Sequence, residues 1–182
     1  MSRLILLNGP PGVGKSTLAH RYADEHPMVL NLDIDRVRDL VGGWRAESDA
    51  AGLLAREIAL AAARVHLGAG HDVVVPQFLG RPEFIERLER LAGEVGAAFH
   101  EIVLLDDKAA MLRRFERRGR ESAEAAHQDA LAQLERGGGL AELSAMYDRL
   151  LSVLAVRPGA RTVRCAEGDQ DVAYREVVRL LA

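Results

Sequence analysis

Residues 9–17 read Gly-Pro-Pro-Gly-Val-Gly-Lys-Ser-Thr and directly follow the apolar run Leu4-Ile5-Leu6-Leu7. The pattern G-x-x-x-x-G-K-[ST] between a strand and a helix is the phosphate-binding P-loop. Its glycines permit backbone conformations in which successive N–H groups point at a polyphosphate. Lys15 can reach the β- and γ-phosphates, and the Ser16 hydroxyl can coordinate Mg²⁺. A site for a nucleoside triphosphate, with ATP the first expectation, is therefore predicted at Gly9, Gly12, Val13, Gly14, Lys15, Ser16 and Thr17.

Apolar runs and helical periodicities alternate along the rest of the chain. Strands are expected at 3–8, 28–32, 72–75, 99–105 and 161–165. Helices are expected at 15–25, 33–41, 50–67, 82–95, 108–117, 123–136, 140–156 and 172–181, with a basic turn at 117–120. In the helix at 50–67, the apolar residues at helical spacing are Leu53, Leu54, Ile58, Ala61, Ala62 and Val65. This alternation predicts an α/β fold in which helices cover both faces of a five-stranded parallel sheet. Without repeats or a linker, residues 1–182 are expected to form one domain.

Composition narrows the cellular setting and the class of partner. The 182 residues carry a formal net charge of −3, which gives no general attraction to nucleic acid or to an anionic membrane. No apolar run approaches the roughly 20 residues of a membrane span, and no signal peptide is evident. A single cysteine, Cys165, fits a reducing cytoplasm and is expected to be a small core residue. Of the 24 lysines and arginines only Lys15 and Lys108 are lysines, and neither lies in the Asn-Lys-x-Asp motif of Ras-type GTPases.

Carboxylates follow the second expected strand in the sequence Asp33-Ile34-Asp35-Arg36-Val37-Arg38. Ligands of open α/β sheets bind beyond the carboxyl ends of the strands, so Asp33 and Asp35 should face the cleft of the P-loop. A hydroxyl that attacks a γ-phosphate benefits from a carboxylate that accepts its proton, and we assign this role to Asp35. Arg38, one helical turn later, can hold substrate or neutralise the transferred phosphoryl group. The alternative is a helix N-cap followed by a solvated arginine.

These motifs together resemble a known group of enzymes. The P-loop, Asp-x-Asp-x-x-Arg after the second strand, and Arg114-x-x-x-Arg118-Gly119 resemble P-loop kinases that act on hydroxyl groups. Within them the chain looks like the polynucleotide 5′-hydroxyl kinases and the chloramphenicol phosphotransferase-like enzymes, with gluconate and shikimate kinases more distant. The resemblance covers about the first 120 residues and implies a three-layer P-loop NTPase fold with strand order 2-3-1-4-5. It implies that Asp35 is the general base, Arg38 acts at the reacting phosphate, and Arg114 and Arg118 reach the nucleotide phosphates from a lid around 113–123.

The arginine-rich segment also points to polyphosphate without the resemblance. Five arginines fall within 113–120, and arginine can make bidentate contacts with phosphate. Among them Arg118 is the best candidate for catalysis, because Gly119 permits movement of a lid. An exposed helix face is the alternative.

Two positions depart from this pattern or extend it. The third expected strand ends in Val75-Pro76-Gln77, where many P-loop kinases carry a carboxylate that holds Mg²⁺ through water. Either Asp33 takes over the metal shell, or the site relies on Ser16 and water. Gln77 is a candidate for the substrate side, with a contact to metal-bound water as the alternative. Trp44 lies where the substrate-binding insertion should begin and is a candidate for stacking on a ligand, with a core role as the alternative. Asp106-Asp107 is expected to cap the helix at 108.

The function expected from these residues is an Mg²⁺- and ATP-dependent kinase that phosphorylates a hydroxyl of a small molecule. A polynucleotide 5′-hydroxyl kinase is the alternative, since the Asp35–Arg38 spacing matches those enzymes. We favour the small molecule because the chain is acidic overall and a groove for a polynucleotide backbone would be basic. An ATP-binding regulatory module without an acceptor is the alternative of another class. The oligomeric state is left open.

Overall fold

The chain folds around one parallel sheet, as the sequence predicts. The computed structural model describes residues 1–121 and 138–182, and the side chains of these except 118–121, so the expected helix at 123–136 lies outside the described residues. The strands are β1 (Arg3–Asn8), β2 (Leu30–Asn31), β3 (Val73–Pro76), β4 (Ala98–Leu105) and β5 (Arg161–Arg164). All neighbouring pairs are parallel, and the order β2-β3-β1-β4-β5 confirms the predicted topology.

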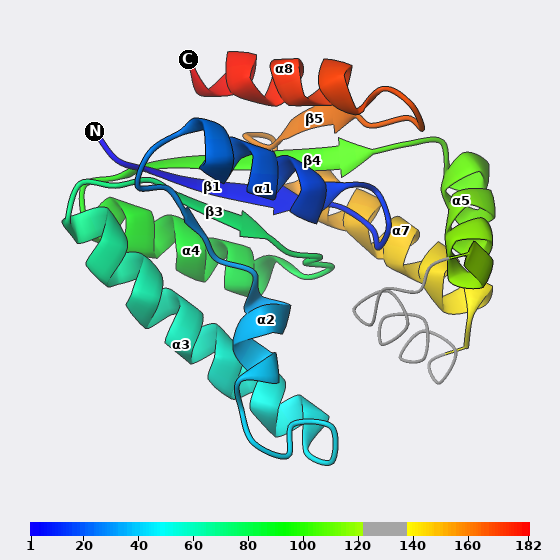
Figure 1. Cartoon of the computed structure of the whole chain (residues 1–182), viewed down its shortest axis with the longest axis horizontal. Helices are drawn as coiled ribbons and strands as arrows, with labels where there is room; N and C mark the ends of the chain where they lie inside the picture. Colours follow the sequence, from blue (N-terminus) through cyan, green and yellow to red (C-terminus); the bar gives the residue numbers. More distant parts are fainter. Residues whose placement is uncertain (122–137) are drawn as a thin grey trace.

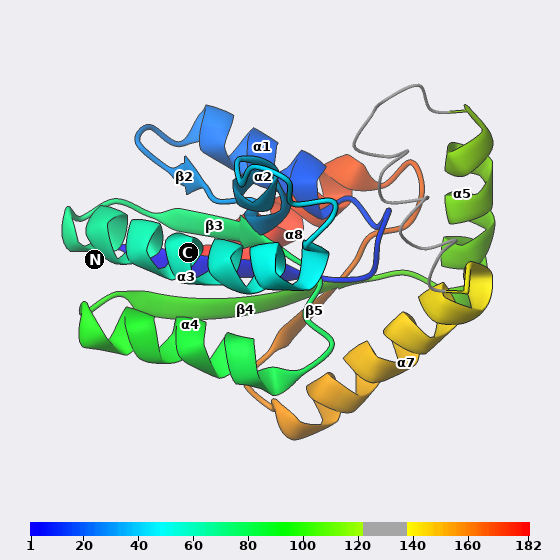
Figure 2. The ribbon, with the colours of Figure 1, turned by 90° about the horizontal axis from the view of Figure 1, so that it is seen from below.

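Helices cover both faces of the sheet. They are α1 (Lys15–Glu25), α2 (Ile34–Asp39), α3 (Ser48–Gly68), α4 (Pro82–Glu94), α5 (Lys108–Glu121), α7 (Leu140–Val156) and α8 (Gln170–Leu181). Figure 1 shows α1 and α8 on one face and α3, α4 and α7 on the other, with α5 beyond the carboxyl end of β4. Seen from below in Figure 2, α3 and α4 lie side by side against the sheet.

The core is divided by the sheet because successive strand residues point to opposite faces. Along β1, Leu4 and Leu6 join the cluster beneath α3 and α4, whereas Ile5 and Leu7 join the cluster beneath α1 and α8. Cys165 is buried in the second cluster, which confirms its expected core role. None of the helices within 1–121 and 138–182 is long and apolar enough to span a membrane.

Helix α3 presents an unexpected face to the core. Its buried residues are Ala51, Ala55, Ala59, Ala63 and Leu67. The larger apolar residues that predicted the helix lie instead on its outside, since Leu53, Leu54, Ile58 and Val65 are all exposed. Alanine lets the helix approach its neighbours closely, and close packing decides which face is buried. The periodicity therefore identified the helix without identifying its buried side.

Several element boundaries differ from the prediction, and three of these differences have a clear local feature. The expected basic turn at 117–120 is wrong, because α5 continues to Glu121. Arginine and glutamate are good helix formers, and one glycine costs only about 1 kcal/mol in a helix. The strand expected at 28–32 is limited to β2, preceded by Met28 with a positive φ of 65°. Residue 165 lies just past β5, although its N–H still donates to the Leu105 carbonyl at 2.7 Å.

Candidate active site

The P-loop connects β1 to α1 in a conformation that requires its glycines. Gly9, Gly12 and Gly14 all have positive φ angles, of 154°, 77° and 110°. A Cβ on Gly9 would also lie 2.6 Å from the Leu104 carbonyl oxygen, so a side chain is excluded there by space as well. Gly14 is the N-cap of α1, and no side chain caps that helix. The first N–H groups of α1 are thus left for another acceptor, such as an anion.

Lys15 lies at the start of α1 and is held over the loop. Its Nζ donates a hydrogen bond to the Pro10 carbonyl at 3.0 Å. Burial lowers the pKa of Lys15 to about 8, while the charges of Asp35 and Asp33 act in the opposite direction. Both carboxylates are therefore close enough to influence Lys15. The structure brings together the P-loop and the two aspartates that the sequence assigned to one cleft.

Asp33 is the N-cap of α2. Its Oδ1 accepts a hydrogen bond from the backbone N–H of Asp35 at 3.0 Å. Burial raises the pKa of Asp33, and the neighbouring charge of Asp35 raises it further. The capping alternative is thus present in the structure. Backbone N–H groups of Asp35 and Arg36 therefore occupy part of this carboxylate's hydrogen-bonding capacity.

Asp35 and Arg38 form an ion pair one helical turn apart. Arg38 Nη1 lies 3.1 Å from Asp35 Oδ1, and its Nη2 lies 3.7 Å from Asp39 Oδ1. The guanidinium group also stacks over the Trp44 ring, 4.3 Å from the ring centroid, and Arg45 stacks on the same ring at 4.5 Å. Trp44 is half-buried and belongs to neither main hydrophobic cluster. The indole thus helps to fix Arg38 beside the carboxylate.

Two buried polar atoms on this side have no hydrogen-bond partner among the described residues. They are Arg38 Nε and Gln77 Oε1. Gln77 follows β3 directly, and its backbone N–H donates to the Leu7 carbonyl at 3.1 Å. Buried polar groups are nearly always satisfied in folded proteins, so these two atoms are candidates for contact with a ligand or a water.

Asn8 is a positioning residue that the sequence analysis missed. It is fully buried at the end of β1, where its Oδ1 accepts from the N–H groups of Gly9 at 2.8 Å and Leu79 at 2.9 Å. Its Nδ2 donates to the Leu79 carbonyl at 3.0 Å. One side chain therefore joins the first residue of the P-loop to the segment that leaves β3. The signal in the sequence was an amide directly before the P-loop glycine.

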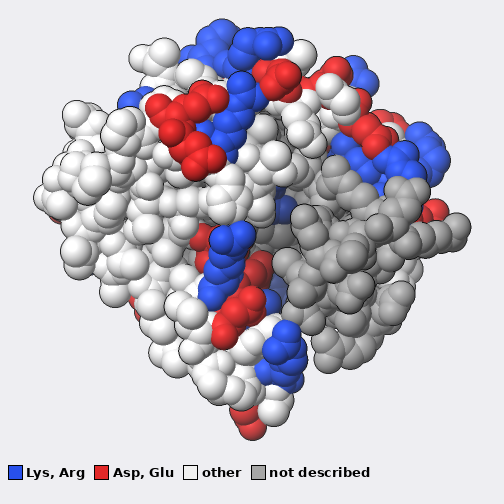
Figure 3. All heavy atoms as spheres, viewed as in Figure 1, with Lys and Arg blue, Asp and Glu red and all other residues white. Residues whose placement is uncertain are grey.

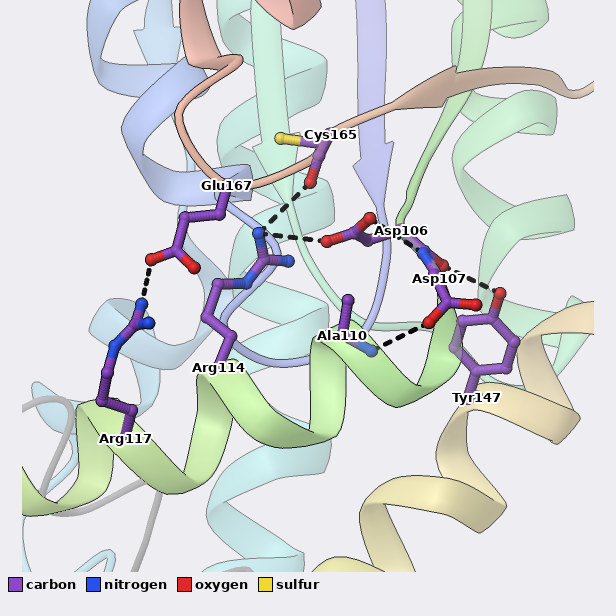
Figure 4. A network of polar contacts seen from close by, with 8 residues as sticks. All are labelled: Asp106, Asp107, Ala110, Arg114, Arg117, Tyr147, Cys165 and Glu167. Atoms are coloured by element: carbon purple, nitrogen blue, oxygen red, sulfur yellow. Dashed lines mark hydrogen bonds and ion pairs between the residues drawn. The ribbon is translucent and has the colours of Figure 1, made fainter.

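Two arginines of α5, Arg114 and Arg117, are engaged within the protein, as Figure 4 shows. Arg114 is buried, forms an ion pair with Asp106 Oδ2 at 3.4 Å, and donates to the Cys165 carbonyl at 3.3 Å. Arg117 pairs with Glu167 in the segment between β5 and α8. These contacts hold α5 against the segments that follow β4 and β5.

The contacts of α5 also bear on two sequence predictions. Asp107 caps α5 by accepting from the Ala110 N–H at 2.9 Å, as expected, whereas Asp106 serves Arg114 instead. The side chain of Arg118 lies outside the described residues. Of the lid expected around 113–123, the structure describes the side chains of 113–117 and the backbone as far as 121. Helix α5 lies near the P-loop, since its Phe115 ring would be 3.7 Å from a Cβ on Gly12.

Residues that could hold Mg²⁺ are few in this region. Within 1–121 and 138–182, no three His, Cys, Asp or Glu side chains gather as a metal site would require. The protein oxygens that the sequence assigned to the metal are the exposed Ser16 hydroxyl and the half-buried Asp33 carboxylate. This fits a cation that keeps several waters and is bound chiefly through nucleotide phosphates.

Known proteins show the same domain type and fold. A family model described as an AAA domain matches residues 4–137. No curated protein matches the sequence. The tunicamycin resistance protein of Deinococcus radiodurans is 20% identical with a TM-score of 0.62, over 100% of this chain and 96% of that one. The APS kinase of Mycobacterium tuberculosis, solved with AMPPNP and APS, is 18% identical with a TM-score of 0.62, over 99% and 97%. A gluconokinase from Sinorhizobium meliloti is 15% identical with a TM-score of 0.57, over 98% and 93%. At such identities the likeness is one of fold.

Proposed function

Because the chain belongs to the AAA domain family and has the fold of P-loop kinases, we propose that it is an ATP-dependent kinase that phosphorylates a hydroxyl group of a small molecule. The observation that carries the proposal is the position of Lys15 near Asp33 and Asp35, with Asp35 paired to Arg38. A glycine loop alone would bind phosphate. A carboxylate beside the loop adds a group that can take a proton from an attacking hydroxyl.

The residues divide into a donor side and an acceptor side. On the donor side, the backbone N–H groups of the P-loop and Lys15 hold the triphosphate of ATP. Mg²⁺, held by Ser16 and assisted by Asp33, would neutralise charge on the β- and γ-phosphates. Arg114 and Arg118 would approach the same phosphates from a lid around 113–123 within a single domain spanning 1–182.

On the acceptor side, Asp35 orients the hydroxyl and accepts its proton as the oxygen attacks the γ-phosphorus and the bond to ADP breaks. Arg38 stabilises charge on the transferred phosphoryl group. Trp44 and Gln77 contribute the wall of the acceptor site: the ring supplies a flat apolar surface, and Gln77 Oε1 accepts a hydrogen bond from the substrate. Two of the similar structures are named as kinases, which supports phosphoryl transfer as the class of reaction.

A polynucleotide 5′-hydroxyl kinase is the second candidate, favoured by the Asp35–Arg38 spacing. The surface around α2 favours a small-molecule acceptor, because acidic and basic side chains alternate there (Figure 3). A polynucleotide backbone would select a continuous basic track. The net charge of −3 points the same way and fits a cytoplasmic enzyme that acts on a metabolite.

The test is a transfer assay with γ-labelled ATP and Mg²⁺. The purified chain is incubated with pools of small hydroxyl compounds, and in parallel with 5′-hydroxyl DNA and RNA oligonucleotides at several salt concentrations. We expect a labelled small molecule, identified by mass spectrometry, and little label on the oligonucleotides. Efficient, salt-sensitive labelling of the oligonucleotides would replace the proposal by the second candidate. Release of phosphate without any labelled acceptor would favour an ATPase module.

A further inference from the structure

A buried ion pair lies at the carboxyl end of β4, and the proposed reaction uses only one of its partners. Asp106 is 7% exposed and Arg114 of α5 is 5% exposed. Asp106 Oδ2 lies 3.4 Å from Arg114 Nη1, and Asp106 Oδ1 accepts a hydrogen bond from the Asp107 N–H at 2.8 Å. The Tyr147 hydroxyl of α7 donates to the Asp106 carbonyl at 3.0 Å (Figure 4). The carboxylate is therefore held in one orientation, facing Arg114.

Stability alone is a poor reason for this pair. Taking two charges out of water costs about as much as their attraction returns, so a buried ion pair adds little net stability over apolar residues of similar size. Helices α5 and α7 also share an apolar cluster made of Met111, Phe115 and Leu143. The two helices thus have a means of packing together that needs no charge, and the ion pair calls for a different explanation.

The pair joins segments that lie directly against the P-loop. The three P-loop glycines with positive φ each approach one such segment, in β4, in α5 or just after β5. A Cβ added to the glycine would lie 2.6 Å from the Leu104 carbonyl oxygen for Gly9, 3.7 Å from the Phe115 ring for Gly12, and 3.4 Å from Cys165 Sγ for Gly14. Arg114 Nη1 donates to the carbonyl of the same Cys165 at 3.3 Å. The guanidinium group is therefore held beside the phosphate-binding loop.

One amino group of Arg114 is left over. Its Nη2 is buried and has no hydrogen-bond partner among the described residues. Buried donors are nearly always paired, so an unpaired one beside an anion-binding loop indicates a contact with a ligand. The guanidinium is a rigid plane, and fixing Nη1 between Asp106 and the Cys165 carbonyl also fixes the direction of Nη2.

We propose that Asp106 is a positioning residue for phosphoryl transfer, which holds Arg114 so that Nη2 is directed at the phosphates bound by the P-loop. This inference rests on the proposed function and adds to it a residue that touches neither nucleotide nor acceptor. Charge is redistributed over the phosphates as the bond to ADP breaks, and a donor that is already oriented stabilises that charge without reorganisation. Without the charge of Asp106, the guanidinium would leave this orientation and lose most of its effect.

The first test measures binding of a mimic of the transition state, so it needs no acceptor. Calorimetry gives the dissociation constants of Mg·ADP alone and of Mg·ADP with aluminium fluoride, which imitates the phosphoryl group during transfer. In Asp106→Asn the amide keeps an oxygen for the Asp107 N–H but loses the charge that holds Arg114. We expect this variant to bind the fluoride complex about 10–100-fold more weakly, as misplacement of an oriented group does, with a much smaller change for Mg·ADP.

Asp107→Ala is the matched control. Asp107 is the next carboxylate along the chain, and it caps α5 by accepting from the Ala110 N–H at 2.9 Å instead of pairing with Arg114. Loss of the cap should lower the midpoint of thermal unfolding and leave both dissociation constants near those of the wild type. An equal loss of fluoride binding in the two variants would mean that attachment of α5 matters and the charge of Asp106 does not.

The second test asks whether Asp106 acts through Arg114. Arg114→Ala should weaken binding of the fluoride complex about 100-fold, as removal of a donor to the transition state does. Adding Asp106→Asn to Arg114→Ala should then cause no further loss, because the group that Asp106 positions is already gone. A purely structural Asp106 would act in both backgrounds, and the two losses would multiply.

Three further outcomes would overturn the proposal. Losses that multiply give Asp106 a role independent of Arg114. Wild-type affinity of Asp106→Asn for the fluoride complex means that Arg114 needs no such partner. A wild type that binds Mg·ADP no more tightly with aluminium fluoride has no transition-state site for Arg114 to serve. The kinase proposal is tested separately by the labelled acceptor: a chain that labels none but shows the expected fluoride binding would lose that proposal and keep this one.

Discussion

The donor side and the acceptor side of the candidate site are built by different means. On the donor side the backbone sets the geometry: Gly9, Gly12 and Gly14 take conformations that other residues avoid, and Asn8 fixes the first N–H of the loop. On the acceptor side, side chains from α2 and the following loop set the geometry, through the Asp35–Arg38 pair and its stacking on Trp44. Both sides hold polar groups without partners among the described residues: the uncapped N–H groups of α1 and Arg114 Nη2 on the donor side, and Arg38 Nε and Gln77 Oε1 on the acceptor side. The difference is that backbone conformation shapes the phosphate site, whereas side-chain contacts shape the acceptor site.

The largest expected effect tests the acceptor side. Asp35→Asn should lower kcat about 10²–10⁴-fold with little change in ATP affinity, because the amide keeps the shape but cannot accept the proton. Asp39→Asn is the control, since Asp39 also faces Arg38 but at 3.7 Å and lies outside the proposed mechanism. Steady-state kinetics with the identified acceptor provide the measurement. Near-normal phosphoryl transfer by Asp35→Asn would remove this carboxylate from the mechanism. The assignment of an acceptor side to α2 would then lose its main support.

The next effect sharpens the donor side. Asn8→Ala should reduce the free energy of unfolding by about 2–4 kcal/mol, because buried backbone groups of Gly9 and Leu79 lose their partners. Asn31→Ala is the control, because Asn31 Oδ1 has no hydrogen-bond partner among the described residues; less than about 1 kcal/mol is expected there. Urea unfolding followed by circular dichroism compares the two. Equal losses would show that Asn8 gives no special support to the loop.

A smaller effect concerns affinity for the nucleotide. Lys15→Ala should raise the dissociation constant of Mg·ATP by about 10–100-fold, the equivalent of one strong charged contact, and leave the fold intact. Titration calorimetry at pH 7 is suitable, since a pKa of about 8 leaves Lys15 mostly protonated there. The only other lysine, Lys108, pairs with Asp148 at 2.7 Å and supplies the control variant Lys108→Ala. If both variants bound ATP equally well, the P-loop assignment would be wrong.

The sequence predicted the features that depend on residues close together in the chain. The P-loop, the strand order implied by family resemblance and the Asp35–Arg38 neighbourhood all come from contiguous motifs. Asn8 was missed because its partner Leu79 is 71 residues away. Arg114 was expected to reach the nucleotide phosphates, and its contact with Asp106 depends on where α5 meets the end of β4. Helical periodicity likewise could not reveal that α3 buries alanines, because that choice depends on how closely the helix approaches the sheet.

The two edge strands of the sheet affect whether folded chains can associate through the sheet. At one margin β2 is only two residues long, and at the other β5 has exposed Arg161 and Arg164 at its two ends. A very short edge strand and repelling positive charges both hinder a strand of another molecule from pairing with the edge of the sheet. Both edges of the sheet are therefore poor sites for edge-to-edge association of folded chains, and binding of a partner by strand addition is disfavoured.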